Sequence, residues 1–188
     1  MNSASHGAPP QHGAFLVSDL CKQEMTRNIT TEPLTPEAFA PFGNILDATG
    51  EPDRVINQGR CLRYHDRAKL DYINGRAGIS IFDAQSRQLP LKLEMVERHP
   101  DGSQAFLPLT MAPFLVVVAE DIDGCPGTPR AFIARPGQGV NYLRNVWHGV
   151  LMPLASPAVF AVVDRIGEGP NLEEHWYSEP WTVLRSVY

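Results

Sequence analysis

The chain has 188 residues, which fits one domain, since roughly 100 to 200 residues per domain is usual. With 43% hydrophobic and 20% charged residues, its composition is that of a folded globular protein. A formal net charge of −5 gives no reason to expect nucleic acid as a partner. Its longest apolar run, APFLVVVA, is also far shorter than the roughly 20 residues that cross a bilayer, so no membrane is expected either.

The N-terminal part of the chain predicts a flexible extension over residues 1–30, followed by one domain over residues 31–188. The first 30 residues are rich in Ser, Gly, Pro and His and show no sustained period, which is typical of segments that do not order. They also lack the basic and apolar parts of a secretion signal. Three widely spaced cysteines, Cys21, Cys61 and Cys125, form no disulfide framework. We therefore expect a cytoplasmic protein.

The segment LTPEAFAPFG predicts a short helix, with Thr35 as N-cap, Pro36 at the first helical position and Gly43 just past the end. Beyond it, runs rich in β-branched and aromatic residues are separated by Pro, Gly and Asp, a pattern typical of strands. The runs are LKLEMVERH, AFLPL, PFLVVVAE, PRAFIARP, GVNYLRNVWHGVL and AVFAVVDRI. We expect an all-β sandwich or barrel with small helices near its two ends, in which PFLVVVAE is a buried strand.

The segment ERHPDGSQAFLPL carries three polar side chains that suit a site. Glu97 and His99 share one face of the predicted strand, because side chains alternate along a strand. Gln104 follows a turn made by Pro-Asp-Gly, so it can converge with the other two. Arg98 then faces the other side, where an exposed ion pair or a dimer contact explains it.

A second polar segment, RNVWH, ends a strand introduced by Gly137 and Gly139. If the strand is regular, alternation places Arg144 and Val146 on one face together with His148. Asn145 and Trp147 then face the other way, and Trp147 is expected to pack in the core or at an interface.

Together these segments resemble the cupin double-stranded β-helix. The cupin pattern HxHx4E is matched by Glu97-Arg98-His99, four residues and Gln104, and its later histidine by His148. Two histidines, one carboxylate and one amide thus replace the usual three histidines and a carboxylate. Imidazole and carboxylate suit a divalent transition metal such as nickel or manganese, whereas an amide is a weak ligand. A metal, if present, is expected at Glu97, His99, Gln104 and His148.

Four segments, taken in order, resemble the ureidoglycolate lyase family more narrowly. They are INQGRCLRYHD, ERHPDGSQAFLPL, GVNYLRNVWH and VVDR, and the similarity runs from about Leu34 to about Arg165. The resemblance implies a homodimeric, cupin-like enzyme that splits ureidoglycolate into glyoxylate and urea, a late step of purine breakdown through allantoin.

The implied reaction needs a clamp for the substrate carboxylate, a base and an acid. Arginine suits the carboxylate because its planar fork offers paired donors, and histidine suits proton transfer because its ordinary pKa is roughly 6.5. Side-chain amides can hold the urea group, since each offers a donor and an acceptor. The candidates are Arg63 and Arg144 for the carboxylate, His65, His99 and His148 for proton transfer, Glu97 as ligand, base or partner of His99, and Gln104 and Asn145 for the amide.

Each candidate also has a structural interpretation. His65 can be a satisfied structural histidine, and Arg63 and Arg144 can be surface charges. Asp164 and Arg165 are interpreted as a structural pair that closes the last strand, outside the site. Two other functions remain open: a metal-dependent cupin isomerase or dioxygenase, which requires a tightly bound metal, and a ligand-binding cupin without activity. An amidohydrolase that releases ammonia from the same substrate is the last alternative, because it would need a richer metal cluster.

Overall fold

The structure, a computed structural model, describes residues 27–187. The predicted extension therefore lies outside the described residues up to residue 26, whereas Asn28 already begins the first strand. No helix in the described range is long and apolar enough to cross a membrane.

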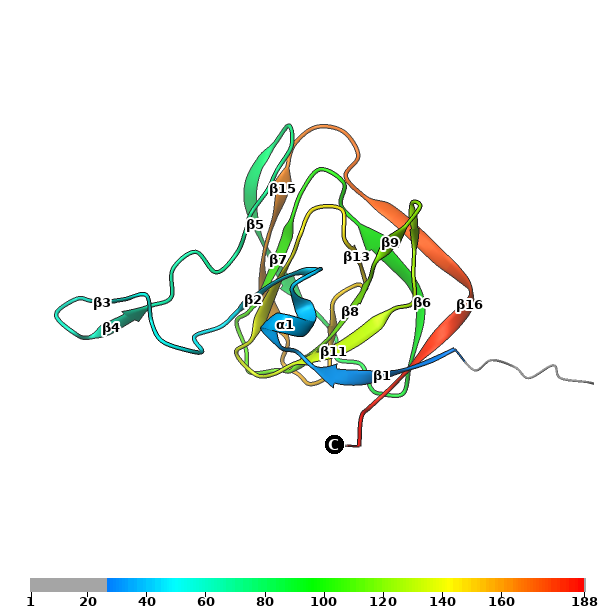
Figure 1. Cartoon of the computed structure of the whole chain (residues 1–188), viewed down its shortest axis with the longest axis horizontal. Helices are drawn as coiled ribbons and strands as arrows, with labels where there is room; N and C mark the ends of the chain where they lie inside the picture. The colour runs from blue at the N-terminus through cyan, green and yellow to red at the C-terminus, as the bar shows by residue number, and fades with distance from the viewer. Residues whose placement is uncertain (1–26, 188) are drawn as a thin grey trace, which may run out of the picture.

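Two β-sheets build the domain (Figure 1). The first, seven-stranded in the order β11-β1-β16-β6-β13-β8-β14, closes on itself because β11 also pairs with β8. Its strands are β1 (Asn28–Pro33), β6 (Leu91–Arg98), β8 (Phe114–Ala119), β11 (Arg130–Ala134), β13 (Trp147–His148), β14 (Met152–Pro153) and β16 (Glu173–Leu184). This closed sheet and the near absence of helix confirm the predicted all-β, cupin-like barrel.

The second sheet has five strands in the order β2-β12-β7-β15-β5 and packs against one side of the closed sheet. Its strands are β2 (Gly43–Leu46), β5 (Arg76–Asp83), β7 (Gln104–Pro108), β12 (Gly139–Tyr142) and β15 (Val159–Ile166). Two hairpins complete the fold: β3 (Arg54–Ile56) with β4 (Cys61–Arg63), and β9 (Asp121–Ile122) with β10 (Cys125–Pro126).

Strand β8 is buried on both faces, as PFLVVVAE predicts. Phe114, Val116 and Val118 lie in the core between the two sheets, together with aromatic residues of the five-stranded sheet. The alternating residues, Leu115 and Val117 among them, lie in a second core inside the closed sheet. A strand that serves two cores needs a continuous apolar run, which explains its composition.

The predicted N-terminal helix is present as α1 (Pro36–Phe39), capped by the Thr35 hydroxyl, which accepts a hydrogen bond from the Ala38 amide. It ends earlier than predicted, and Gly43 begins β2 instead of following the helix. A side chain at Gly43 would collide with the Asn141 carbonyl, so the close pairing of β2 and β12 requires glycine there. The expected second helix near the C-terminus is wrong, because that segment forms β16 and pairs with β6 and β1.

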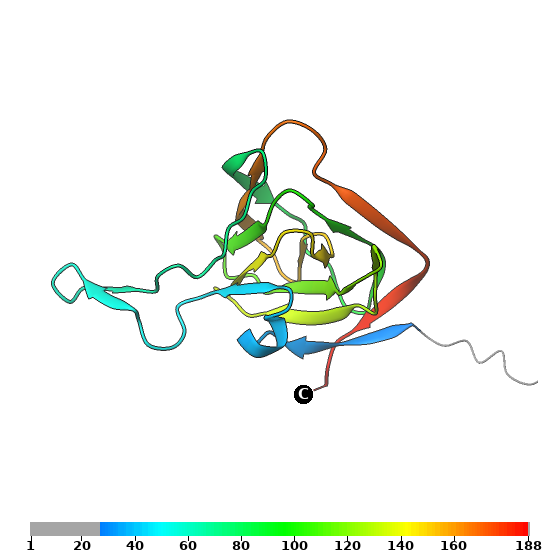
Figure 2. The same ribbon diagram turned by 45° about the horizontal axis from the view of Figure 1, so that its top comes forward.

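Residues 47–75 form a long excursion between β2 and β5, the two edge strands of the five-stranded sheet. Its central hairpin, β3–β4, projects away from the barrel in Figures 1 and 2. The returning part contacts the barrel again, where the Lys69 carbonyl accepts a hydrogen bond from the Asn141 side chain. We call residues 53–67 the arm and residues 69–72 its root.

Candidate active site

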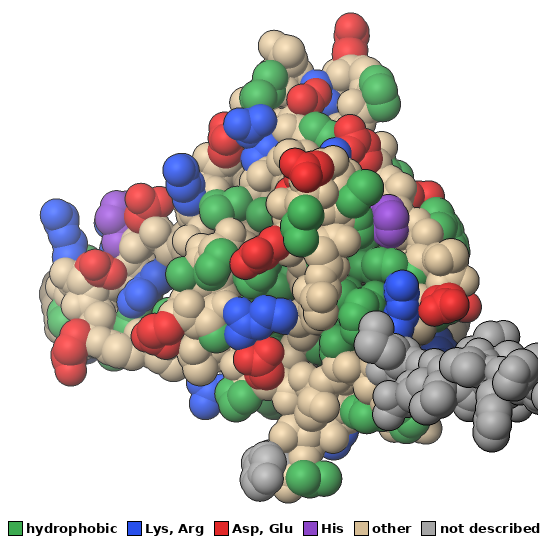
Figure 3. All heavy atoms as spheres, turned by 45° about the vertical axis from the view of Figure 1, so that its right-hand side comes forward, with side chains coloured by type: hydrophobic (Ala, Val, Ile, Leu, Met, Phe, Trp, Pro, Cys, Tyr) green, Lys and Arg blue, Asp and Glu red, His purple; other side chains and the backbone are tan. Residues whose placement is uncertain are grey.

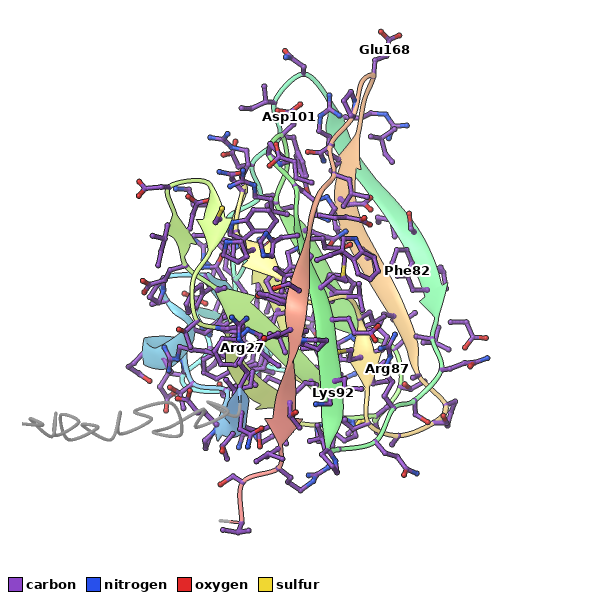
Figure 4. The ribbon with its side chains drawn as sticks, turned by 90° about the vertical axis from the view of Figure 1, so that its right-hand side faces the viewer. Arg27, Phe82, Arg87, Lys92, Asp101 and Glu168 are labelled. Carbon is purple, nitrogen blue, oxygen red and sulfur yellow. The ribbon has the colours of Figure 1, made fainter. Side chains whose placement is uncertain are left out.

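Three potential ligands converge between the two sheets. Glu97 on β6 and His148 on β13 are direct cross-strand partners, so their side chains point the same way. His99 follows Glu97 by two residues and shares its face. One ligand atom from each of the three lies within 4.8 Å of the others, and the two imidazole centroids are 5.3 Å apart. In Figure 4 this end of the barrel is marked by Asp101.

Backbone carbonyls orient both imidazoles. His99 Nδ1 lies 2.6 Å from the Asn171 carbonyl, and His148 Nδ1 lies 3.1 Å from the Gly149 carbonyl. Because a carbonyl oxygen only accepts, each Nδ1 carries the proton. Both Nε2 atoms are buried without a hydrogen-bond partner among the described residues. A ring protonated only on Nδ1 presents an Nε2 lone pair to the cluster.

The five-stranded sheet supplies the opposite wall. The Tyr142 ring stacks on His148, with centroids 4.2 Å apart and planes 3° from parallel. Gln104 is buried, and its Oε1 has no partner among the described residues, nor has Asp164 Oδ1. A hydrogen bond from Gln104 and the charge of His99 both act on the Asp164 carboxyl, so these groups adjoin one another. Tyr72, from the arm root, lies in the same region. Desolvation raises the pKa of its hydroxyl, and the nearby charge of Asp164 raises it further.

Burial controls the ionisation of this cluster. Desolvation, with the nearby His99 as a smaller cause, lowers the pKa of His148 to about 3, so this ring is neutral at physiological pH. Desolvation raises the pKa of Glu97, and the charge of Glu174 adds to the shift while His99 opposes it. Desolvation likewise raises the pKa of Asp164. His148 is thus a poor proton acceptor, and proton transfer falls to His99 and the carboxyl groups.

The lowered pKa of His148 makes the fold sensitive to acid. A histidine whose pKa falls on folding contributes stability that is complete above its unfolded value of 6.5 and is lost as the pH drops toward about 3. We expect the thermal unfolding midpoint of chelator-treated protein to fall between pH 6.5 and pH 4.5, and to fall less in His148→Gln. The raised pKa of Glu97 acts in the opposite sense, but Glu97 is present in both proteins. Equal slopes in the two proteins would contradict the assignment.

The cluster suits a divalent metal. Metal-binding imidazoles commonly donate their other ring N–H to a backbone carbonyl, as both histidines do here. Two buried Nε2 lone pairs, the Glu97 carboxylate and the unpartnered Gln104 oxygen make a nitrogen and oxygen donor set.

The segment RNVWH does not form one regular strand, so its predicted alternation is wrong. Residues 144–145 make a turn in which Asn145 has φ +68°, a left-handed conformation that asparagine tolerates. The exposed Arg144 donates to Asp71 at 3.0 Å and to the Pro100 carbonyl at 3.1 Å. Asn145 is exposed as well, and its backbone N–H donates to the His99 carbonyl. Both residues therefore brace the loop that carries His99.

Arg63 and His65 lie on the arm, away from the cluster of their own chain (Figure 1). Arg63 Nη2 is 2.9 Å from His65 Nδ1, and the His65 amide donates to Asp53. Figure 3 shows charged, histidine and hydrophobic side chains together on the surface of this projection. Within one copy of the chain, these two candidates contribute nothing to the cluster.

The structure corrects the predicted interpretation of Asp164 and Arg165, and it agrees with the predicted orientation of Arg98. Asp164 and Arg165 are not a structural pair: Asp164 faces the cluster, whereas Arg165 donates to the carbonyls of Ile73, Asn74 and Glu168. Arg98 points away from the cluster, as predicted, and forms ion pairs with Asp121 and Glu173 beneath the Trp147 ring.

Tyr142, Asp164 and Asn171 are site residues that the sequence pattern did not identify. Alternation along the strand could have identified Asp164, because it shares a strand face with the buried Phe160 and Val162. The role of Asn171 is different, since its backbone carbonyl holds His99 and its side chain accepts from the Asp101 amide. Such a contact, 72 residues away along the chain, carries no local sequence signal.

A separate cavity of about 620 Å³ lies near the C-terminal residues, lined by Thr31, Arg135 and Arg185 among others. It contains none of the cluster residues. We place the site at the cluster, because a site for proton transfer needs titratable groups within reach of one another and the cluster supplies them.

Known proteins are similar to this chain in sequence along most of its length. A family model described as ureidoglycolate lyase matches residues 26–184. A protein named ureidoglycolate lyase from Rhodobacter capsulatus is 65% identical over 153 residues, covering 81% of this chain and 95% of the relative. Proteins of the same name from Chelativorans sp. and Mesorhizobium japonicum are each 54% identical, covering 84% and 85% of this chain and 96% and 98% of the relatives.

Proposed function

The chain belongs to the ureidoglycolate lyase family, and we propose that it splits ureidoglycolate into glyoxylate and urea. The observation that carries this proposal is the convergence of two imidazoles, with buried Nε2 atoms, and a carboxylate in one partly buried cluster. Such groups can both remove and return a proton within a site shielded from water.

The reaction is an elimination that needs no water and no redox partner. The base takes the proton from the hydroxyl of the carbinolamine carbon, and the oxygen electrons form the carbonyl of glyoxylate. The bond from this carbon to the ureido nitrogen breaks, and the nitrogen takes up a proton to leave as urea. The same proton can be moved from oxygen to nitrogen, so the atoms and charges balance.

The chain offers a group for each task. His99 is the base in this scheme, because its Nε2 lone pair is unpartnered and its Nδ1–H is anchored on Asn171. Gln104 and Asp164 hold the ureido group, since the unpartnered oxygens of both can accept its N–H donors. With its raised pKa, Asp164 is also suited to carry the proton to the leaving nitrogen.

A divalent transition metal, nickel or manganese, is a proposed cofactor held by Glu97, His99, Gln104 and His148. When bound it would supply a positive charge that polarises the substrate hydroxyl and carboxylate. A histidine on the metal would have no lone pair left for a proton, so the base would then be an Asp164 carboxylate. Arg144 could also approach the substrate carboxylate, but only by leaving Asp71.

Metal content gives a test that does not depend on turnover. We expect purified protein to hold about one transition-metal ion per chain, and Glu97→Gln to lose most of it, because a carboxylate is a far better ligand than an amide. The matched control is Glu174→Gln, which changes the carboxylate paired with Glu97 across the strands but leaves the cluster intact. Metal analysis that finds the same content in Glu97→Gln and wild type would exclude this ligand set.

The products test the reaction itself. Purified protein incubated with ureidoglycolate, with and without chelator, is expected to release urea and glyoxylate in equal amounts. Urea and ammonia are quantified separately, because an amidohydrolase acting on the same substrate would release ammonia. Ammonia as the nitrogenous product would refute the lyase.

We further propose that the protein is a cytoplasmic homodimer. Cys61 and Cys125 are free thiols, which supports a reducing compartment. Exposed apolar side chains on the arm and on the five-stranded sheet support association between copies.

A further inference from the structure

The arm, residues 53–67, has no packing partner in the described part of its own chain. Its side-chain hydrogen bonds, such as those joining His65 to Asp53 and Arg63, stay within the segment. Val55 and Leu62 face each other across the hairpin and are 56% and 55% exposed. Because a two-stranded hairpin alone is at best marginally stable in water, this one needs a surface to pack against.

A suitable surface lies on the outer face of the five-stranded sheet. Ile79 and Ile81 on β5 are 75% and 63% exposed, and Ile81 continues into a row with Ala161 and Leu107 on the neighbouring strands. An exposed sheet face is normally polar, so an apolar row indicates a covered surface. The arm leaves from this same side of the molecule, between the edge strands β2 and β5 (Figure 1).

The charge of the arm favours a second copy of this chain as the molecule against which it packs. The arm, residues 53–67, carries four arginines and two aspartates in a chain of net charge −5. The end of the barrel that holds the site is acidic: Asp101 and Glu168 lie there (Figure 4), and the site itself contains the carboxyl groups of Glu97 and Asp164. A basic arm on one copy thus complements the acidic site end of another.

A two-fold axis also brings arm and site together. In a two-fold dimer the same surface is used by both copies, so two arms packed antiparallel place each tip beside the other's root. The root adjoins the site: Asp71 is paired with Arg144 and with Ser103, and Tyr72 lies near Asp164. Eight residues separate Arg63 from Asp71, an extended length of roughly 26 Å, so the arm is long enough for this exchange.

The site lacks one component that the arm can supply. The arginines around the cluster are engaged within their own chain: Arg98 with Asp121 and Glu173, Arg144 with Asp71, and Arg165 with three backbone carbonyls. In contrast, no carboxylate in residues 27–187 pairs with Arg60 or Arg63. A substrate with a carboxylate needs such an uncommitted guanidinium.

We propose that the arms are exchanged between two copies, and that Arg63 of the partner subunit binds the substrate carboxylate at the His99 and His148 cluster. The proposal rests on the proposed function for the identity of the ligand. The arm exchange itself rests only on exposure, charge and topology.

Mixed dimers test whether Arg63 acts across the subunit boundary. Arg63→Ala alone is expected to lower kcat/KM by about 10- to 100-fold, mainly through KM, with part of the loss restored in Arg63→Lys. Arg63→Ala and His99→Ala chains with different tags are co-expressed, and dimers that carry both tags are purified. One of their two sites is then intact, so about half of the wild-type activity per dimer returns.

Matched dimers of His99→Ala with His148→Ala are the control, because both changes lie in the same barrel and cannot complement each other. Activity of the Arg63→Ala and His99→Ala hybrid no higher than that of its parents would overturn the proposal. Wild-type kcat/KM in Arg63→Ala alone would overturn it as well.

Sedimentation separates a failure of this proposal from a failure of the proposed function. Wild type is expected to sediment as a dimer and Leu62→Asp as a folded monomer, since that side chain is exposed in the single chain. Ile122→Asp, with a residue of 57% exposure on the opposite side of the molecule, is expected to remain a dimer (Figure 1). If wild type cleaves no ureidoglycolate, this result alone decides: dissociation of Leu62→Asp supports arm exchange, and a monomeric wild type or a dimeric Leu62→Asp overturns it.

Discussion

His99→Ala is expected to lower kcat for ureidoglycolate cleavage by about 100-fold or more, the usual contribution of a positioned proton-transfer group. His99 is suited to this role because its Nδ1–H is fixed on the Asn171 carbonyl while its Nε2 lies unpartnered beside Glu97 and His148. Loss of a metal ligand would lower kcat in the same variant, and the metal content of the variant distinguishes the two causes.

The matched control for this prediction is His175→Ala. His175 is partly buried on β16 and contacts the rings of Trp147 and Tyr177, outside the cluster. Steady-state kinetics should show kcat close to wild type in this control. A His99→Ala enzyme with unchanged kcat and KM would remove His99 from the catalytic site.

Phe160→Ala is expected to lower the free energy of unfolding by about 3–5 kcal/mol, the usual cost of truncating a buried aromatic side chain. Phe160 on β15 is fully buried, and its ring packs edge-on against Phe114 of the closed sheet at 5.1 Å between centroids. The contact joins the two sheets that enclose the site, and it lies on the strand that carries Asp164.

Denaturant unfolding of wild type and variant measures this loss. Ile122→Ala is the control, because Ile122 is exposed and a surface truncation of this kind usually changes stability by less than about 0.5 kcal/mol. A loss in Phe160→Ala as small as in this control would mean that the contact between the sheets is not a main source of stability.

The all-β class and the pairing of Glu97 with His99 could be predicted from sequence because both depend on local alternation along strands. The predicted strand is interrupted at Asn145, where one residue with positive φ divides it into two short strands. A single asparagine is compatible with either geometry, so the break depends on tertiary contacts such as that between its amide and the His99 carbonyl.

The position of Asp164 and of the arm depended on strand order, which sequence does not reveal. Asp164 reaches the cluster because β15 lies next to β7, which begins with Gln104. Arg63 and His65 were identified as site candidates from the motif that contains them, yet within one chain they project away from the barrel. A motif can mark a functional residue without indicating which copy of the chain it serves.

A structure of the protein with glyoxylate bound tests most directly where the carbon–nitrogen bond is cleaved. We expect glyoxylate between the two sheets, with its carbonyl oxygen beside the cluster of Glu97, His99 and His148. Glyoxylate bound only in the cavity near the C-terminal residues, where Arg135 and Arg185 could hold its carboxylate, would contradict it.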